Sequence, residues 1–184
     1  MNWLPHLQRA TALDADARAL LREQGSLTLR LRRACRQFAV RCLCQRVASL
    51  SPDEADCLAL RVGQVVWERD VLLVTDGRPA VFAHTVMPYC PRHPFDRYFA
   101  ALQSQPLGKL LFSDPRILRG ALEFRRLDRH DALYRRILEA LADDAPVALP
   151  PRLWARRSRF NRQAKGVLVT EVFLPASTFT GVRP

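Results

Sequence analysis

Alternating apolar and polar positions predict β-hairpins in two parts of the chain. Strands are expected over residues 64–75, 80–87, 153–162 and 167–174. The first two are joined around Asp76-Gly77, a pair that favours the tight turn of a hairpin, and Pro79 suits the start of the second strand. The last two flank a turn at residues 163–166, and Pro175 ends the final strand. Both pairs are therefore predicted to be antiparallel neighbours.

Apolar residues at helical spacing, together with capping residues, predict the other elements. Helices are expected over residues 14–24, 27–36, 95–103, 106–112 and 131–142, and further strands over 37–47 and 117–127. Gly25 supplies a left-handed stop for the first helix, and Ser26 suits the N-cap of the second. The alternation of Leu27, Leu29 and Leu31 also permits a strand there. Hairpins dominate, so the predicted fold class is α+β: a single domain over all 184 residues, built on an antiparallel sheet.

Composition places the chain among ordinary globular proteins. It is 48% hydrophobic and 26% charged, which excludes wholesale disorder. No run approaches the roughly 18 consecutive apolar residues of a membrane span, and the first residues lack the pattern of a secretory signal. We therefore expect a cytoplasmic protein with no stable membrane insertion. Its five cysteines include no CxxC pair and are expected to be free thiols.

An excess of arginine is the strongest global signal. The formal net charge is +11, and Lys109 and Lys165 are the only lysines among 29 basic residues. Such a charge is typical of nucleic-acid binding, but these arginines are scattered, whereas a binding surface needs them clustered. Residues 154–160 are basic and flanked by aromatic residues, yet they lack stacked aromatics at successive outward positions. The charge suits small anions equally well, and no nucleic-acid partner is expected.

Two charged residues interrupt otherwise apolar strand faces. Arg69 is the only polar residue at the odd-numbered positions of 65–73, and Glu171 the only one at those of 167–173. A buried charge is costly unless it is paired or serves a ligand. Two interpretations stay open. Either the two residues form an ion pair or meet water, or they line a closed cavity in which the arginine holds a carboxylate and the glutamate has a polar or proton-transfer role.

Other candidate chemistry is weaker. The four histidines are isolated in the sequence, and no metal-ligand spacing, nucleophile elbow or glycine-rich phosphate loop occurs. Neither a metal nor an organic cofactor is therefore expected. His84 is expected to be a surface histidine or a hydrogen-bonded core histidine. Cys42 and Cys44 are expected on one strand face, packed in the core.

The final hairpin carries the most specific motif of the chain, Trp154-Ala-Arg-Arg-Ser-Arg-Phe160 followed by Leu168-Val-Thr-Glu-Val-Phe-Leu-Pro-Ala176. Upstream, in order, stand Trp67-Glu-Arg-Asp-Val-Leu-Leu73, Thr85-Val-Met-Pro88 and Pro106-Leu-Gly-Lys-Leu-Leu-Phe112. In this order the segments resemble the bacterial chorismate pyruvate-lyase family. The resemblance extends over most of the chain from about residue 20 to residue 176.

The resemblance implies a fold and a reaction. The fold is a six-stranded antiparallel sheet with helices that act as flaps over an internal site. The reaction converts chorismate to 4-hydroxybenzoate and pyruvate without a cofactor and opens ubiquinone biosynthesis. We expect a monomer whose partners are these small molecules.

The resemblance also implies site residues. The ligand-contacting arginine and glutamate of the family fall on Arg69 and Glu171, and a leucine contact falls on Leu107. A methionine contact falls on Leu27, where this sequence departs from the family. Arg69 would bind a substrate carboxylate, and Glu171 would contact the ring hydroxyl or move the C4 proton. The stretch 128–151 is longer than in the shorter members of the family.

Functions of two other classes remain as alternatives. One is a ligand-sensing domain of the same architecture, as in effector-binding modules of some transcription regulators. Such a module normally follows a helix-turn-helix, for which we expect no room because the resemblance begins near residue 20. The other is a basic nucleic-acid-binding protein, whose binding would weaken steeply with salt. Release of 4-hydroxybenzoate and pyruvate from chorismate separates both from a lyase.

Overall fold

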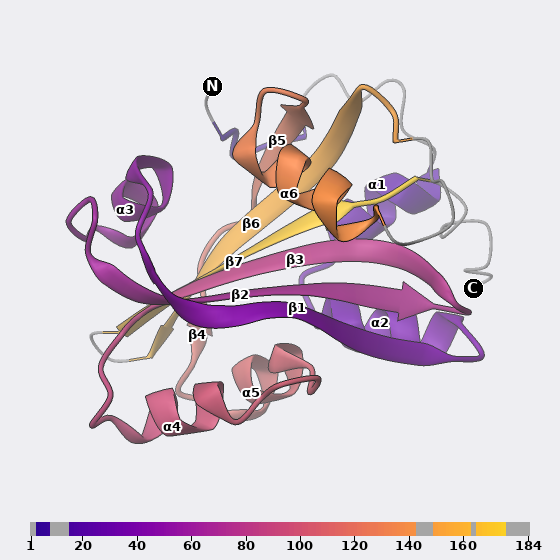
Figure 1. Ribbon diagram of the computed structural model, residues 1–184. Coiled ribbons are helices and arrows are strands. Elements are labelled where there is room, and N and C mark those ends of the chain that lie inside the picture. Colours follow the sequence, from indigo (N-terminus) through magenta and orange to yellow (C-terminus); the bar gives the residue numbers. More distant parts are fainter. Residues whose placement is uncertain (1–2, 8–14, 143–148, 163–164, 176–184) are drawn as a thin grey trace.

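A twisted antiparallel sheet crosses the molecule, with helices on both of its faces (Figure 1). The computed structural model describes residues 3–7, 15–142, 149–162 and 165–175. Its helices are α1 (Ala15–Leu21), α2 (Leu27–Ala34), α3 (Pro52–Leu58), α4 (Pro94–Ala100), α5 (Leu107–Ser113) and α6 (Ala132–Ala140). Its strands are β1 (Phe38–Ser49), β2 (Val65–Thr75), β3 (Arg78–Pro88), β4 (Leu118–Arg119), β5 (Glu123–Asp128), β6 (Arg152–Arg162) and β7 (Lys165–Phe173). The predicted α+β class is confirmed.

Seven strands fill six positions across the sheet. The order is β1-β2-β3-β7-β6-β4, and β5 also pairs with β6. β4 pairs with one end of β6 and β5 with the other, so they follow each other along the same edge. One continuous strand over 117–127 was therefore a wrong prediction. The strand is interrupted near Gly120, whose N–H donates to the Arg159 carbonyl at 2.7 Å. The expected six-stranded sheet is correct in width but not in strand count.

The hairpin of β2 and β3 has the predicted turn. Asp76 and Gly77 have φ angles of 47° and 77°, as a tight two-residue turn requires. The Asp76 carboxylate accepts backbone hydrogen bonds from Arg36 and Gln37, at 2.9 and 2.8 Å, and thereby ties the turn to the start of β1. Pro79 lies at the beginning of β3, as predicted. In the last hairpin, residues 163–164 of the predicted turn lie outside the described residues.

The two helices that flank β1 differ in how well the sequence predicted them. Residues 27–34 are helical, and the strand alternative for them is wrong. The Ser26 hydroxyl caps this helix, and Leu27 and Leu31, four residues apart, are buried on one side of it. Helix α3 was not predicted. Its signal was the capping box, in which Glu54 accepts hydrogen bonds from the N–H and hydroxyl of Ser51.

The two faces of the sheet pack against different helices. On one face α1 and α2 cover residues such as Val71 and Phe173, and α4 and α5 extend this cover toward Phe160. On the other face α6 packs against residues such as Leu72 and Val172, and α3 packs against residues such as Val86 and Leu168 (Figure 1). Strand residues thus alternate between two cores. No helix in the described part of the chain is long and apolar enough to cross a membrane.

A β-bulge in β1 overturns the prediction for two cysteines. The pairing of β1 with β2 passes from Cys42 opposite Val71 to Cys44 opposite Asp70, so one extra residue lies in β1. Cys42 consequently packs in the core beneath α1 and α2, whereas the Cys44 thiol lies with Asp70 on the other face. The expectation that both thiols share a face was wrong, because a bulge breaks the period of two.

Part of the stretch 128–151 contributes to the second core. Helix α6 buries Tyr134 and Ile137 against the face that carries Leu72, and the Tyr134 hydroxyl donates to the Pro150 carbonyl at 2.8 Å. Residues 143–148 of this stretch lie outside the described residues. The described part of the stretch thus stabilises the fold on the face away from Arg69.

Candidate active site

The four residues predicted for the site line one cavity. Leu27, Arg69, Leu107 and Glu171 come from four different elements and surround an internal space of about 50 Å³. Its floor is the sheet face of β2, β3 and β7, and the starts of α2 and α5 cover it. The volume is room for a few water molecules. The site is therefore narrow in this conformation.

Strand register places Arg69 and Glu171 on the same face. Arg69 pairs with Thr85 on β3, and Glu171 pairs with Ala83 on the same strand. Because two inter-strand spacings separate β2 from β7, their Cα atoms are more than about 9 Å apart. Both charged side chains line the same pocket, on the sheet face to which the alternation in β2 and β7 assigns them.

Glu171 is paired with Arg156 rather than with Arg69. Arg156 lies directly opposite Glu171 on β6, and its Nε donates to Glu171 Oε2 at 2.6 Å. Arg156 is 1% exposed, and its Nη1 also donates to the carbonyls of Leu20, Leu21 and Glu23 at the end of α1. The last carbonyls of a helix have no partner within it and carry partial negative charge. The alternative of an Arg69–Glu171 ion pair is therefore wrong.

Arg69 is a buried cation whose described partners are uncharged. It is 2% exposed, and its Nη2 donates to the carbonyls of Gln103 and Gln105 at 2.7 and 2.8 Å. Its Nε is buried with no hydrogen-bond partner among the described residues. Burial lowers the pKa of Arg69, although an arginine remains charged near neutral pH. The nearby Cys42 side chain acts on this pKa in the opposite direction, and the Nε N–H stays an unsatisfied buried donor.

A third arginine, Arg119 of β4, also lines the cavity. Its Nε donates to the Ser158 hydroxyl at 2.9 Å, and its Nη1 to the Gln24 carbonyl at 2.6 Å. Its guanidinium lies 5.6 Å and 5.3 Å from the ring centres of Phe112 and Phe160. Burial and the nearby charge of Arg156 lower the pKa of Arg119 to about 10.

Two helix starts meet above the sheet. Leu27 and Leu107 are the first residues of α2 and α5, and both side chains are buried. A Cβ on Gly108 would lie 3.0 Å from the Ser26 hydroxyl oxygen, so glycine permits the close approach of the two helices. The first N–H groups of a helix have no partner within it. The backbone N–H groups of Leu27 and Leu107 are thus positioned as possible donors at the cavity.

The charges of the cavity are unbalanced. Arg69, Arg119 and Arg156 contribute three positive charges, and Glu171 contributes one negative charge, which leaves an excess of two. The rest of the lining is mostly apolar, with residues such as Val71 and Val169, and includes the hydroxyl-bearing Ser26, Thr28 and Thr85. In a dry apolar enclosure charges interact more strongly than in water. The arrangement can therefore bind a doubly negative, largely apolar molecule and place one carboxylate against it.

Arg119 and Arg156 were missed as site residues. For Arg156 the sequence held a signal, because alternation in 154–160 separates its side chain from those of Arg157 and Arg159. For Arg119 the sequence held little signal, because the strand that carries it has only two residues and was predicted with the wrong extent.

A second polar cluster lies on the opposite face of the sheet. His84 is buried, with Nδ1 2.6 Å from Asp70 Oδ1 and Nε2 2.7 Å from Glu54 Oε1. Burial alone would lower the pKa of His84, but these two hydrogen bonds outweigh it and raise the pKa to about 9. Arg136 of α6 pairs with both Asp70 and Glu68. The prediction of a hydrogen-bonded core histidine is confirmed.

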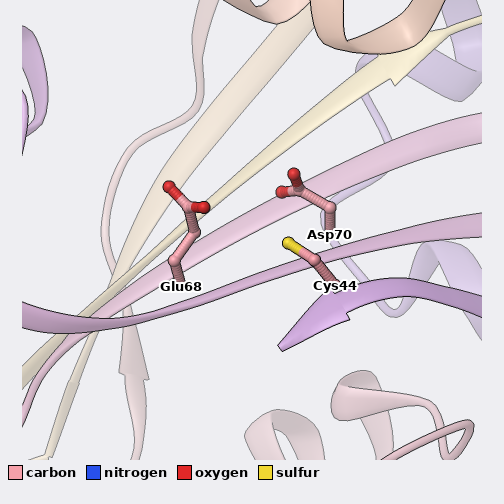
Figure 2. Close-up of side chains that lie close together, drawn as sticks. All are labelled: Cys44, Glu68 and Asp70. Atoms are coloured by element: carbon pink, nitrogen blue, oxygen red, sulfur yellow. The ribbon is translucent and has the colours of Figure 1, made fainter. Parts of the chain in front are cut away.

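The same cluster contains a grouping of potential metal ligands. Figure 2 shows the thiol of Cys44 and the carboxylates of Glu68 and Asp70 directed toward one another. The two carboxylates are already paired with Arg136 and, for Asp70, with His84. Burial and the charge of Asp70 raise the pKa of Cys44, which disfavours the thiolate that a metal needs. These donors do not fit a metal centre.

Comparisons with known proteins agree with the resemblance. A family model described as chorismate lyase matches residues 3–183. A probable chorismate pyruvate-lyase from Aromatoleum aromaticum is 47% identical over 177 residues, covering 95% of this chain and 92% of the relative. One from an Azoarcus species is 43% identical over 176 residues, covering 95% and 91%. Among solved structures, the C-terminal domain of PhnF matches with a TM-score of 0.56 at 14% identity, covering 73% of this chain and 80% of that one. At that identity the likeness concerns the fold alone.

Proposed function

The chain belongs to the chorismate lyase family, and from that premise we propose that it splits chorismate into 4-hydroxybenzoate and pyruvate. The ether C–O bond at ring carbon C3 breaks, the C4 proton leaves the ring, and the methylene carbon of the released enolpyruvate gains a proton. Atoms balance without an oxidant, reductant or water. The substrate's own ring supplies the driving force by becoming aromatic. The proposed setting is the first committed step of ubiquinone biosynthesis in the cytoplasm.

The observation that carries this proposal is the excess of two positive charges in an apolar enclosure. Chorismate has two carboxylates on a small hydrocarbon frame, so its charge and polarity complement the cavity. A site that holds the reactive conformer in the absence of bulk water needs no nucleophile for this elimination. Neither metal nor organic cofactor is required by the proposed chemistry.

In this proposal Arg69 binds a substrate carboxylate. Its buried Nε has no partner among the described residues, and Arg69 lies across the sheet face from Glu171. A guanidinium matches the geometry of a carboxylate, and a charge-assisted bond in a dry cavity is stronger than in water. Arg69 thereby orients the ring.

Glu171 acts at the opposite end of the ring. Arg156 holds Oε2 and fixes the side chain, which leaves the other carboxylate oxygen for the substrate. Glu171 accepts a hydrogen bond from the C4 hydroxyl or moves the C4 proton toward the methylene carbon. Loss of the hydroxyl contact would weaken ligand binding, whereas loss of proton transfer would slow turnover. Measuring both quantities in Glu171→Gln therefore distinguishes the two roles.

Leu27 and Leu107 contribute through their backbones in this proposal. Each opens a helix that covers the cavity, and each side chain packs in the core. A backbone N–H is the same in leucine and in the family's methionine, so the departure at residue 27 has little effect on binding. Because the space between the lining residues is only about 50 Å³, we expect the starts of α2 and α5 to move apart when substrate enters.

The experiment is incubation of the purified protein with chorismate. 4-Hydroxybenzoate is followed by its absorbance and pyruvate by a lactate dehydrogenase assay, and the two are expected in equal amounts. Reaction without protein gives the background. A ligand-sensing domain would bind chorismate or 4-hydroxybenzoate without releasing pyruvate, and that outcome would reject the lyase.

A further inference from the structure

We infer that Arg119 binds the enolpyruvyl carboxylate of the substrate, at the opposite end of the cavity from the carboxylate that Arg69 holds. This inference rests on the proposed function. Chorismate carries one carboxylate on ring carbon C1 and the other on the side chain at C3, next to the C4 hydroxyl. Two separated carboxylates require two separated cations, and the structure offers a second one at the Glu171 end.

The remaining donor of Arg119 is what makes it available. Its Nε is committed to Ser158, and its Nη1 is shared among the carbonyls of Glu23, Gln24 and Gly25. Among the described residues Nη2 has no hydrogen-bond partner. The fixed contacts on the other two nitrogens hold the guanidinium in one orientation, so little rotamer freedom is lost when an anion binds.

Arg156 is a poorer candidate for the same carboxylate. Its Nε donates to Glu171 and its Nη1 to three carbonyls at the end of α1, so its Nη2, like that of Arg119, has no hydrogen-bond partner among the described residues. Arg156 is, however, 1% exposed and lies between the sheet and α1, whereas Arg119 is only half-buried. Arg156 therefore orients Glu171, and Arg119 is the more accessible of the two to an anion.

Electrostatics near Arg119 favour an incoming anion. Burial and the repulsion from Arg156 both oppose its positive charge, while Glu171 favours it. Arg119 Nη1 and Arg156 Nη1 both donate to the Glu23 carbonyl, at 3.4 and 2.8 Å, and Arg156 holds Glu171. Arg119 therefore lies at the Glu171 end of the cavity, where the C3 side chain of chorismate would lie if Glu171 acts at C4. A carboxylate bound there would offset the repulsion between the two arginines. The rings of Phe112 and Phe160 flank the guanidinium at 5.6 and 5.3 Å from their centres.

The product offers a contrast that isolates Arg119. 4-Hydroxybenzoate retains only the ring carboxylate, so it needs Arg69 but has no group for Arg119. Replacing Arg119 should therefore weaken the substrate and spare the product. A residue that merely held the loop after α1 would affect both ligands alike.

The test compares Arg119→Gln with wild type in two assays. We expect kcat/KM for chorismate to fall about ten- to a hundred-fold, the usual effect of losing a hydrogen bond to a charged group. We expect the Kd for 4-hydroxybenzoate, measured by calorimetry, to change less than about two-fold. Arg116→Gln is the matched control, because it removes an exposed arginine that lies three residues before Arg119, pairs with Asp114 and is not among the residues that line the cavity.

Three outcomes would overturn the inference: an unchanged kcat/KM, a Kd for 4-hydroxybenzoate that rises as much as kcat/KM falls, or the same losses in Arg116→Gln. If Arg119→Gln does not fold, Arg119→Lys keeps the charge and is expected to show the same selective loss in smaller measure. If wild type binds but does not convert chorismate, the proposed function fails. In that case the Kd for chorismate is compared between wild type and Arg119→Gln. Arg119→Gln is expected to bind chorismate more weakly while binding 4-hydroxybenzoate as wild type does, and an unchanged Kd for chorismate refutes the role of Arg119.

Discussion

Arg156 and Glu171 face each other directly across β6 and β7, joined by a bond of 2.6 Å from Nε to Oε2. The same arginine binds the end of α1 through Nη1. One side chain thus connects Glu171 to a helix that covers the same face of the sheet. The orientation of Glu171 and the docking of α1 are expected to depend on each other.

This pairing predicts energetic coupling between the two residues. Arg156→Met should lower the free energy of unfolding by about 3 kcal/mol, because it leaves a largely buried carboxylate without its partner. Adding Glu171→Gln should recover part of that loss. A double-mutant cycle by urea unfolding measures the coupling. The same cycle on Arg69 and Glu171 should be additive, and coupling there would contradict the arrangement described.

Arg69→Ala should weaken 4-hydroxybenzoate binding about ten- to a hundred-fold, as expected for loss of a charge-assisted contact. Arg69→Lys should recover only part, because an ammonium lacks the planar fork. Calorimetry gives both affinities. Arg46→Ala, which removes a more exposed arginine of neighbouring β1, is the control. An unchanged affinity in Arg69→Ala would remove Arg69 from the site.

Glu171→Gln should bind 4-hydroxybenzoate nearly as wild type does yet turn over chorismate slowly, if Glu171 moves the C4 proton. A loss confined to product affinity would instead indicate the hydroxyl contact. Single-turnover kinetics beside calorimetry distinguish these. Glu123→Gln is a matched control, since Glu123 makes the same 2.6 Å bond to Arg157 Nε away from the cavity.

Stability should fall at alkaline pH because of His84. Its pKa is raised to about 9 from an ordinary 6.5, so the folded state holds the proton more tightly than the unfolded state. The contribution is fully present below pH 6.5 and is lost as the pH rises through 9. Its size is on the order of 3 kcal/mol, from about 1.4 kcal/mol per pKa unit.

Urea unfolding at pH 6 and pH 9.5 measures this effect. In His84→Gln the free energy of unfolding should differ less between pH 6 and pH 9.5 than it does in wild type. His130→Gln, at an exposed position, should behave as wild type.

Glu54 has the opposite effect on the pH dependence of stability. Burial would raise the pKa of Glu54, but the His84 contact lowers it to about 2, so its contribution is lost as the pH falls below about 4.5.

Activity should survive exhaustive chelation and dialysis. The proposed elimination needs positioned charges, and the thiol and carboxylates of Cys44, Glu68 and Asp70 are unsuited to a metal. Turnover is compared before EDTA treatment, after it, and after addition of divalent metal. Activity that returns only with added metal would contradict this prediction.

Most of the fold could be predicted because its signals are local. Alternation along β2 and β7, the positive-φ turn at Asp76-Gly77 and the apolar stripe of α2 each depend on neighbours within a few residues. The same period of two placed Arg69 and Glu171 on inward faces. Predictions failed where the period itself broke, at the bulge between Cys42 and Cys44 and at the division near Gly120.

By itself, the sequence determined the α+β class, the two hairpins and the two charges that disturb apolar faces. Only the tertiary structure decided which charge meets which. Cross-strand register and the docking of α1 paired Glu171 with Arg156, 15 residues away, and left Arg69 Nε without a partner. Arg119 lines the same cavity from β4, a strand of two residues that is too short to show an alternation of apolar and polar positions. Alternation fixes the face on which a side chain lies, whereas its partners depend on how distant strands and helices pack together.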